Sequence, residues 1–311
     1  MKKLVSSALS AAMLASMLPF TASADDSTPD KCLYFKPKTN SELTIESDGT
    51  VVLSRETIKK LGYTMPVDIF FYDKAATCWY VSPKWKCASG FIKIQNVVDP
   101  LPIKGEKLPY AYALADENGN IIDSTYSVSG KNDPECNTAY FTCQSNINFA
   151  AEALVPYGER TDSYPLTSFD AKINMNIPYG DYSIYFLTQS EDYEDQRISA
   201  INSIDVMKER VPEVRELKIR VEGANLGDID NNGTINSIDA SRALSAYSSS
   251  STGAGHGLTA LEFEAADIDK NGQISSTDAS EILGYYSYLA TTNDPLDFAD
   301  FRKAEKENSS K

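Results

Sequence analysis

Hydrophobic and polar residues alternate along much of the first two thirds of the chain. In the stretch 166–177, Ala171, Ile173 and Met175 alternate with polar side chains, the two-residue period of a strand with one buried face. Other segments rich in β-branched and aromatic residues also predict strands, with turn sequences at 117–120 and 178–181: they are 67–72, 91–97, 110–114, 140–144, 146–150, 182–187 and 217–221. With one short helix over 54–61, the pattern predicts a mostly β N-terminal module over 25–222, an antiparallel jelly-roll-like β-sandwich.

The pattern becomes helical after residue 226. Helices are predicted over 237–247, 258–266 and 276–288. The first and last are expected to bury one apolar stripe each, made of Ala240, Ala243, Leu244 and Tyr247 on one helix and of Ala279, Ile282, Leu283 and Tyr286 on the other. Residues 223–226 would form a short linker, 227–290 a small α-helical module, and 291–311 a charged C-terminal tail.

An internal repeat lies in this helical region. The segment 228–248, DIDNNGTINSIDASRALSAYS, aligns with 267–287, DIDKNGQISSTDASEILGYYS, at an offset of 39 residues. Each copy fits the twelve-residue EF-hand-like calcium loop, in which oxygen ligands occupy positions 1, 3, 5, 7, 9 and 12. Gly233 and Gly272 stand at position 6, where the chain must turn sharply. At position 8 the residues Ile235 and Ile274 are expected to pair backbone-to-backbone across the two loops.

The predicted ligands are carboxylates, amides, a hydroxyl and backbone carbonyls. Position 7 contributes its carbonyl, and the serine at position 9 of the second loop binds directly or through a water. In chain order they are Asp228, Asp230, Asn232, Thr234, Asn236 and Asp239, then Asp267, Asp269, Asn271, Gln273, Ser275 and Asp278. Oxygen ligands at flexible geometry favour calcium, and magnesium is the weaker candidate. We predict two calcium ions whose binding is coupled to folding; the alternative is Asp/Asn/Gly-rich turns without a metal.

Paired calcium loops that each lead into a helix resemble the type I dockerin family, found on components of cellulose-degrading multiprotein complexes of anaerobic bacteria. Both loops end in Asp, one methylene shorter than the Glu of an ordinary EF-hand, and the segment 222–225 leaves no room for an entering helix. The resemblance covers residues 226–290. It implies a calcium-dependent module that docks into the cohesin of a scaffold protein.

The resemblance also implies which residues contact the cohesin. Positions 10 and 11 of each loop, with positions further along each helix, carry over to Ser237, Ile238, Leu244, Ser245, Ser276, Thr277, Leu283 and Gly284. The serines at position 10 suit helix N-capping equally well. Because one copy has Ser-Ile where the other has Ser-Thr, the two faces are not expected to bind equivalently.

Several N-terminal segments resemble the cohesin family, the socket that receives dockerins. These segments are 65–69, 146–150, 165–169, 177–184 and 217–222, and they occur in the family's order. The resemblance implies an adaptor scaffoldin, a non-catalytic part of an extracellular cellulose-degrading complex. Its dockerin would enter one partner while its cohesin-like module holds a dockerin-bearing enzyme.

Two other functions stay open for the N-terminal module. In a carbohydrate-binding module, Trp79, Tyr80 and Trp85 would stack on sugar rings, although a sandwich core also takes a Trp. A dockerin-borne polysaccharide-degrading enzyme would need two carboxylates at a fixed separation. No spacing marks such a pair among the available acids, so no enzymatic activity is predicted: they are Glu152, Glu159, Asp162 and Asp170.

The N-terminus has the pattern of an export signal. Lys2 and Lys3 precede an apolar run over 4–20, and small residues at 22–24 place a cleavage site before Asp25. The run is shorter than the ~20 apolar residues that a membrane span needs. We therefore expect a secreted, extracellular protein without a membrane span, held at the cell surface or in a complex through its partner.

Charge and composition narrow the chemistry further. The 311 residues include 29 Lys and Arg against 44 Asp and Glu, and the net charge of −15 argues against a nucleic-acid partner. A single histidine, His256, leaves little material for histidine-dependent catalysis or a zinc site. Five cysteines in an exported chain leave one over: Cys78 with Cys87 and Cys136 with Cys143 are candidate local pairs with Cys32 alone, unless all five stay reduced.

Overall fold

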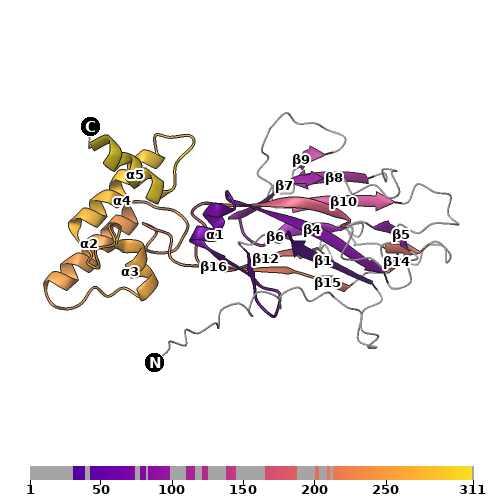
Figure 1. The fold of residues 1–311 in the computed structure, drawn as a ribbon, viewed down its shortest axis with the longest axis horizontal. Coiled ribbons are helices and arrows are strands. Elements are labelled where there is room, and N and C mark those ends of the chain that lie inside the picture. The colour runs from indigo at the N-terminus through magenta and orange to yellow at the C-terminus, as the bar shows by residue number, and fades with distance from the viewer. Residues whose placement is uncertain are drawn as a thin grey trace, which may run out of the picture. The chain divides into compact units, whose positions relative to one another are not determined.

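A computed structural model of the protein describes residues 31–38, 43–73, 78–81, 83–98, 110–115, 121–124, 138–144, 165–187, 200–202, 209–210 and 213–309. The chain divides into two compact units. The first contains Met1–Val51, Met65–Ala171 and Ser183–Lys218, and the second contains Val52–Thr64, Lys172–Tyr182 and Ile219–Lys311. Figure 1 shows strands in the N-terminal region and helices in the C-terminal region. The predicted combination of a β module with a small helical module is therefore confirmed.

One sheet is formed by five of the described strands. Its order is β15 (Glu213–Arg215), β1 (Lys31–Pro37), β4 (Thr64–Asp73), β11 (Thr167–Ile173) and β7 (Ile92–Val98). β1 pairs antiparallel with β4 but parallel with β15, where Cys32 lies opposite Glu213. The expectation of a purely antiparallel sandwich was therefore wrong at this edge, because β15 arrives from a distant part of the chain and not through a hairpin.

The second sheet contains the remaining described strands. Its path runs through β14 (Glu209–Arg210), β13 (Ala200–Asn202), β5 (Cys78–Val81), β10 (Thr138–Gln144), β6 (Lys84–Cys87), β12 (Gly180–Phe186), β16 (Leu217–Glu222), β3 (Val51–Ser54) and β2 (Thr44–Ile45). β8 (Tyr110–Ala115) pairs with β10 and with β9 (Ile121–Ser124). The predicted strands over 67–72, 91–97, 110–114, 140–144, 182–187 and 217–221 correspond to β4, β7, β8, β10, β12 and β16. The predicted strand 146–150 and the turn 117–120 lie outside the described residues.

The strand predicted over 166–177 is shorter in the structure. β11 ends at Ile173, and the chain then turns. Asn174 causes this ending: its side-chain Oδ1 accepts a hydrogen bond from the Asn176 amide at 2.8 Å, and its carbonyl accepts one from the Ile177 amide at 3.0 Å. An asparagine that bonds to the backbone two residues ahead offers the chain a turn in place of a ladder. Alternation alone could not detect it.

Aromatic side chains fill the core of the first unit. Trp85 is fully buried and packs on Phe169, with ring centroids 5.5 Å apart. Phe35 stacks on Phe186 at 4.1 Å between centroids. Trp85 is thus a core residue and is not available to stack on a sugar.

The second unit holds all the described helices. α1 (Arg55–Lys60) confirms the short helix predicted over 54–61, and it starts at the cap Ser54, whose Oγ accepts the Thr57 amide at 3.1 Å. The helical module, defined here as residues 223–309, contains α2 (Ser237–Ser251), α3 (Ala260–Ala266), α4 (Ser276–Leu289) and α5 (Phe298–Ser309) (Figure 1). α2, α3 and α4 confirm the three predicted helices.

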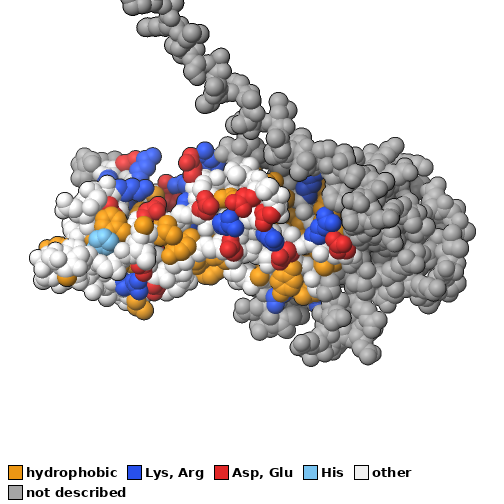
Figure 2. All heavy atoms as spheres, turned by 90° about the horizontal axis from the view of Figure 1, so that it is seen from below, with side chains coloured by type: hydrophobic (Ala, Val, Ile, Leu, Met, Phe, Trp, Pro, Cys, Tyr) orange, Lys and Arg blue, Asp and Glu red, His pale blue; other side chains and the backbone are white. Residues whose placement is uncertain are grey.

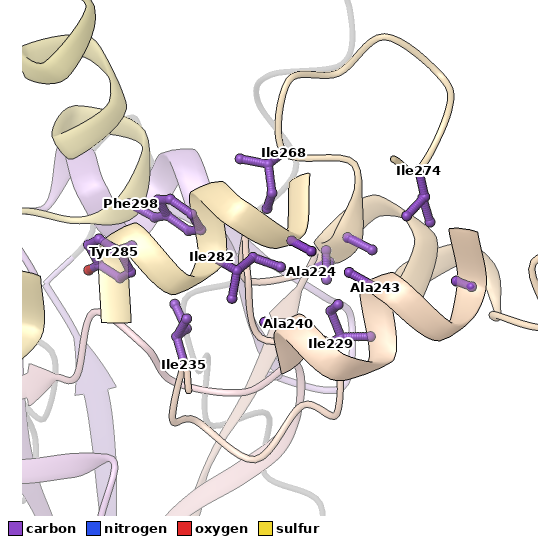
Figure 3. Close-up of a cluster of buried hydrophobic side chains, with 14 residues drawn as sticks. Ala224, Ile229, Ile235, Ala240, Ala243, Ile268, Ile274, Ile282, Tyr285 and Phe298 are labelled. Atoms are coloured by element: carbon purple, nitrogen blue, oxygen red, sulfur yellow. The ribbon is translucent and has the colours of Figure 1, made fainter. Parts of the chain in front are cut away.

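The core of the helical module is built from isoleucines, alanines and aromatic residues. Ile229 and Ile235 from the first loop segment and Ile268 and Ile274 from the second all bury their side chains there. Figure 3 shows Ile235 and Ile274 entering the cluster from opposite sides. No backbone hydrogen bond joins these two described residues, so their predicted pairing was wrong.

The apolar stripes of α2 and α4 also differ from expectation. Ala240, Ala243, Ala279 and Ile282 are buried as predicted. However, Ala246 and Tyr285 complete the buried face, whereas Leu244, Tyr247, Leu283 and Tyr286 are each more than two fifths exposed. Small alanines bring α2 and α4 close together, so the larger side chains at neighbouring positions point outward.

The predicted charged tail forms helix α5 and packs on the module. Phe298 is almost fully buried and stacks on Tyr285, with ring centroids 4.4 Å apart and an interplanar angle of 8°. Arg302 forms an ion pair with Glu281 of α4 and donates to the carbonyl of Ile268. Phe298 also lies against Gly227, where any Cβ would approach its ring to 2.5 Å. The tail is therefore part of the folded module.

A cluster of polar contacts joins α1 to the residue that precedes α5. The Lys59 ammonium lies 2.9 Å from Asp297 and 2.8 Å from Asp300, and the Tyr63 hydroxyl donates to Asp297 at 2.9 Å. Burial would raise the pKa of Asp297, but hydrogen bonds from Lys59, the Asp300 amide and Tyr63 together hold it below its usual value. Burial and the bond to Asp297 raise the pKa of Tyr63 to about 12. Asp297 is therefore held in its ionised form.

Across the described part of the chain, no helix combines the length and apolarity required to cross a bilayer.

Candidate calcium-binding site

Three carboxylates converge in each loop of the repeat. In the first loop, Asp228, Asp230 and Asp239 each offer an oxygen that lies within 4.8 Å of the others. The second loop brings Asp267, Asp269 and Asp278 together within the same limit. With metal–oxygen bonds of about 2.3–2.6 Å, ligands on opposite sides of a calcium ion lie about 5 Å apart. Both clusters therefore have the dimensions of a calcium cage.

Backbone amides hold the buried carboxylates of the first loop in place. Oδ1 of Asp239 accepts from the Ile229 amide, and its Oδ2 accepts from the Asn236 amide, both at 2.9 Å. The two oxygens of Asp228 accept from the amides of Asn232 at 3.0 Å and Gly233 at 2.9 Å. A carboxylate oxygen has more than one acceptor direction, so these bonds orient the group and leave capacity for a cation.

The second loop repeats this network at every corresponding position. Asp278 accepts from the amides of Ile268 at 2.9 Å and Ser275 at 2.8 Å. Asp267 accepts from Asn271 at 3.1 Å and Gly272 at 2.8 Å. Two sequences that differ at several positions thus fold into one hydrogen-bond pattern. The repeat is a structural unit used twice.

Left-handed backbone conformations close each loop. Gly233 and Gly272 have φ of +84° and +82°, as expected for position 6. Position 4 is also left-handed, although its residues are Asn231, with φ of 55°, and Lys270, with φ of 60°. Asparagine tolerates this region better than lysine does. The strain at position 4 was not foreseen from the sequence.

The remaining predicted ligands lie in the same loops. Oδ1 of Asn232 accepts the Thr234 amide at 2.7 Å, and Oδ1 of Asn271 accepts the Gln273 amide at 2.8 Å. In each loop, this bond curves the backbone between positions 5 and 7 around the centre of the loop. Asn236 and Ser275, at position 9, cap the helices that follow: Oδ1 of Asn236 accepts the Ile238 amide at 2.7 Å and Oγ of Ser275 accepts the Thr277 amide at 3.1 Å.

The helix caps are therefore Asn236 and Ser275, one residue before the serines considered from the sequence. Ser237 and Ser276 are instead the first helical residues of α2 and α4, and both are exposed. Asp239 and Asp278 complete a capping box with their caps, because each accepts the cap's own backbone amide. One carboxylate thus closes the loop and starts the helix.

The donor set fits calcium. It contains only oxygens, and three carboxylates per loop bring enough negative charge for a divalent cation. Burial raises the pKa of Asp228 and of Asp239, partly offset by the amide hydrogen bonds and reinforced by the neighbouring carboxylates. Charge concentrated in this way is the environment that a bound dication relieves.

The residues carried over as cohesin contacts are all exposed on or beside α2 and α4. Among the apolar ones, Ile238 is 58 %, Leu244 44 % and Leu283 41 % exposed. Tyr247 and Tyr286, not among the predicted contacts, show similar exposure at equivalent positions of the two copies. The polar and small members of the set are also exposed: Ser237, Ser245, Ser276, Thr277 and Gly284.

Other candidate groups have structural roles or lie outside the described residues. His256, pale blue in Figure 2, lies beside Phe263 at 4.9 Å between ring centroids, and its Nδ1 accepts the Leu258 amide. Oδ2 of Asp170 accepts from Asn96 at 2.8 Å. Cys32 and Cys87 are buried free thiols, so the suggested Cys78–Cys87 pair is not formed, and burial raises the pKa of Cys87 to about 12. The other acids and the remaining cysteine and aromatic side chains are not described: Glu152, Glu159, Asp162, Cys78, Cys136, Cys143, Trp79 and Tyr80.

Comparison with known proteins agrees with the site's geometry. Residues 226–285 match the family model of the dockerin type I domain. The chain therefore carries a dockerin type I domain, a class of calcium-binding module. No curated protein matches the sequence of the chain.

Solved structures similar to the chain include cohesin modules. A type III cohesin from the cellulosomal ScaE cell-surface anchoring scaffoldin of Ruminococcus flavefaciens has 11 % identity and a TM-score of 0.38, covering 63 % of this chain and 90 % of its own. The third ScaB cohesin of R. flavefaciens, in complex with a group 1 dockerin, has 13 % identity and a TM-score of 0.37, covering 63 % and 98 %. A cohesin–dockerin complex from Clostridium thermocellum has 12 % identity and a TM-score of 0.32, covering 51 % and 89 %.

Proposed function

We propose that this chain is a non-catalytic component of an extracellular cohesin–dockerin assembly of the cellulosome type. Its helical module would bind two calcium ions and dock into the cohesin of a scaffold protein. One observation carries the proposal: two oxygen cages with the same hydrogen-bond pattern lie 39 residues apart, each leading into a helix with exposed apolar side chains.

The loops connect calcium binding to the orientation of the helices. Calcium supplies two positive charges against the three carboxylates of each loop and so reduces their mutual repulsion. Asp239 and Asp278 belong both to the cages and to the first turns of α2 and α4. Ile229 and Ile268, one residue after the first ligand of each loop, anchor the loops in the core. A fixed loop therefore fixes the start and direction of its helix.

The docking surface we propose lies on the outer faces of α2 and α4. Leu244 and Tyr247 on α2 correspond to Leu283 and Tyr286 on α4, and all four are exposed. A cohesin that covers them would bury apolar area at roughly 25 cal/mol per Å². Ile238 corresponds to the polar Thr277, so the α2 face is the more apolar of the two. We expect the two faces to contribute unequally.

For the N-terminal module we propose a cohesin-like socket that holds a dockerin-bearing enzyme, which makes the chain an adaptor scaffoldin. Support comes from its two sheets and from four of the five cohesin-like segments, which fall in order on β4, β11, β12 and β16; the segment 146–150 lies outside the described residues. A carbohydrate-binding module is the second candidate, now without Trp85 as a stacking residue. Asp170, the described member of the acids considered for glycoside hydrolysis, accepts a hydrogen bond from Asn96, and the role that we propose for the module is non-catalytic.

The proposed location is extracellular. The export signal over residues 1–24 stays a prediction, since these residues lie outside the described part. Attachment at the cell surface would come through the partner.

Binding to isolated type I cohesins tests the proposal. The chain starting at Asp25 should bind at least one member of a cohesin panel in calcium, and binding should be lost in a chelator. Leu244→Ala combined with Leu283→Ala should weaken binding at least tenfold, as expected for two truncated apolar anchors. Leu296→Ala, a leucine of similar exposure outside α2 and α4, is the matched control. Binding that is indifferent to calcium, or to the double substitution, would refute the proposed docking mode.

A further inference from the structure

The two calcium loops differ in what surrounds their fourth position. In the first loop, Asn231 directs its side chain at the turn that joins β11 to β12. Oδ1 of Asn231 accepts the amide of Tyr179 at 2.9 Å, and Nδ2 donates to the carbonyl of Tyr179 at 3.1 Å. Asn231 thus satisfies both polar backbone groups of one residue. The turn and the loop belong to the same compact unit.

Further contacts hold the same turn beside the start of the first loop. The Arg55 guanidinium donates through Nη1 to the carbonyl of Ile177 at 2.5 Å and through Nε to that of Gly223 at 3.0 Å. Nδ2 of Asn225 donates to Oδ1 of Asn176 at 3.4 Å. Arg55, Asn225 and Asn231 therefore all bind the same turn, at Ile177, Asn176 and Tyr179 respectively.

Among the residues that the structure describes, none makes an equivalent contact with the second loop. Position 4 there is Lys270, which has the same left-handed backbone, an exposed side chain and no hydrogen-bonded side-chain partner among the residues described. A residue outside the second loop contacts that loop at a different position: Arg302 of α5 donates a hydrogen bond to the carbonyl of Ile268. The repeat therefore places two nearly identical cages in unequal surroundings.

We propose that Asn231 is a positioning residue of the first calcium loop, and that it couples calcium binding in that loop to the order of the turn over 174–180. This rests on the proposed calcium binding of the helical module. The two hydrogen bonds between Asn231 and Tyr179, called the clamp here, already restrict position 4. They therefore reduce the conformational entropy that the loop loses when its ligands close around an ion. By reciprocity, an ion in the loop must also order the turn. Calcium bound in the first loop is thereby linked to the connection between β11 and β12.

Two matched glycine substitutions separate this effect from a general loosening of the loops. Asn231→Gly removes the clamp but allows the left-handed backbone, and Lys270→Gly makes the same backbone change in the second loop. Hydrogen exchange of the whole chain from Asp25 is followed with and without calcium, and calorimetry measures the two affinities. In the parent chain and in Lys270→Gly, calcium should slow exchange across 172–182, including the Tyr179 amide.

In Asn231→Gly that protection should disappear, and the affinity of one site should fall about fivefold, the effect of losing roughly one net hydrogen bond. Calcium protection of both loops without any change over 172–182 in the parent chain would overturn the inference and leave calcium binding intact. Equal behaviour of the two glycine variants would also overturn it. Absence of calcium protection in either loop would instead refute the proposed calcium binding itself.

Discussion

Asp239 and Asp278 show how a short carboxylate is placed at the end of each proposed calcium loop. Each stands at position 12, one methylene shorter than glutamate. Each also lies in the first turn of its helix, where it accepts the amide of the cap residue three positions earlier. The helix therefore begins inside the loop and brings the shorter side chain to the cage.

The buried carboxylates of the first loop predict how calcium stabilisation depends on pH. Because burial raises the pKa of Asp228 and Asp239 without metal, their contribution to calcium-free stability is present at low pH. It is lost as the pH rises through the raised pKa values. Calcium needs the ionised carboxylates, so the gain in melting temperature from calcium should be largest near neutral pH. It should shrink as the pH falls towards the usual carboxyl range of about 4.

Thermal unfolding of the whole chain in calcium and in calcium-free buffer, across a pH series, measures this gain. A gain that is constant from neutral to acidic pH would show that these carboxylates do not bind the ion.

For individual residues, the sequence predicted correctly those site positions that are set by spacing along the chain alone. The offset of 39 residues and the twelve-residue pattern placed the acidic residues of each cage and the glycines at position 6. The observed helix caps lie one residue before the serines considered from the sequence, because the side chains of Asn236 and Ser237 are both good caps in isolation. The clamp made by Asn231 depends on Tyr179, a residue 52 positions away, and no local pattern could reveal it.

Helix α5 extends the dockerin fold beyond the residues that the family model covers. The matched region ends at residue 285. Beyond it, Phe298 of α5 stacks on the buried Tyr285 of α4, and Arg302 forms an ion pair with Glu281 of α4. Phe298→Ala should lower the free energy of unfolding by about 3–4 kcal/mol, as for other buried phenylalanines. Urea unfolding of the whole chain in calcium, followed by helical circular dichroism, measures the change.

Leu296→Ala serves as the control, because Leu296 is exposed and uses only its backbone to bond Tyr285 and Tyr288. This substitution should cost less than about 1 kcal/mol. Similar losses for both variants, or none for Phe298→Ala, would mean that α5 is not part of the folded module.

Prediction of elements from sequence succeeded for strongly periodic segments and failed for weakly periodic ones. α2 and α4 were placed within a few residues, but the choice between Tyr285 and Tyr286 as the buried tyrosine depends on the packing of α4 on α5. In α5 itself two phenylalanines stand among many charged residues, so the segment has the composition of a tail. The end of β11 at Asn174 depends on a single side-chain hydrogen bond.

For the whole molecule, the adaptor proposal requires that the chain bind two different partners at once. Mixed with a type I cohesin and with a protein that bears a dockerin, the chain from Asp25 should form a ternary complex in calcium. Light scattering coupled to size exclusion would give its mass. Leu244→Ala with Leu283→Ala should release the cohesin and retain the dockerin-bearing protein, because these leucines lie on the helical module.

Failure of any dockerin-bearing protein to join, combined with retention of the chain on cellulose or xylan, would favour a carbohydrate-binding module instead. The arrangement of the strands in two sheets was predictable only in outline, because sheet order depends on pairings between distant segments such as β1 with β15.

Calcium titration calorimetry of the chain from Asp25 tests the central claim most directly. We predict uptake of two ions per chain, with one site lost in Asp239→Asn and the other in Asp278→Asn, since each residue closes its own cage. Absence of calcium uptake by the parent chain, or an unchanged count of two ions in both variants, would contradict it.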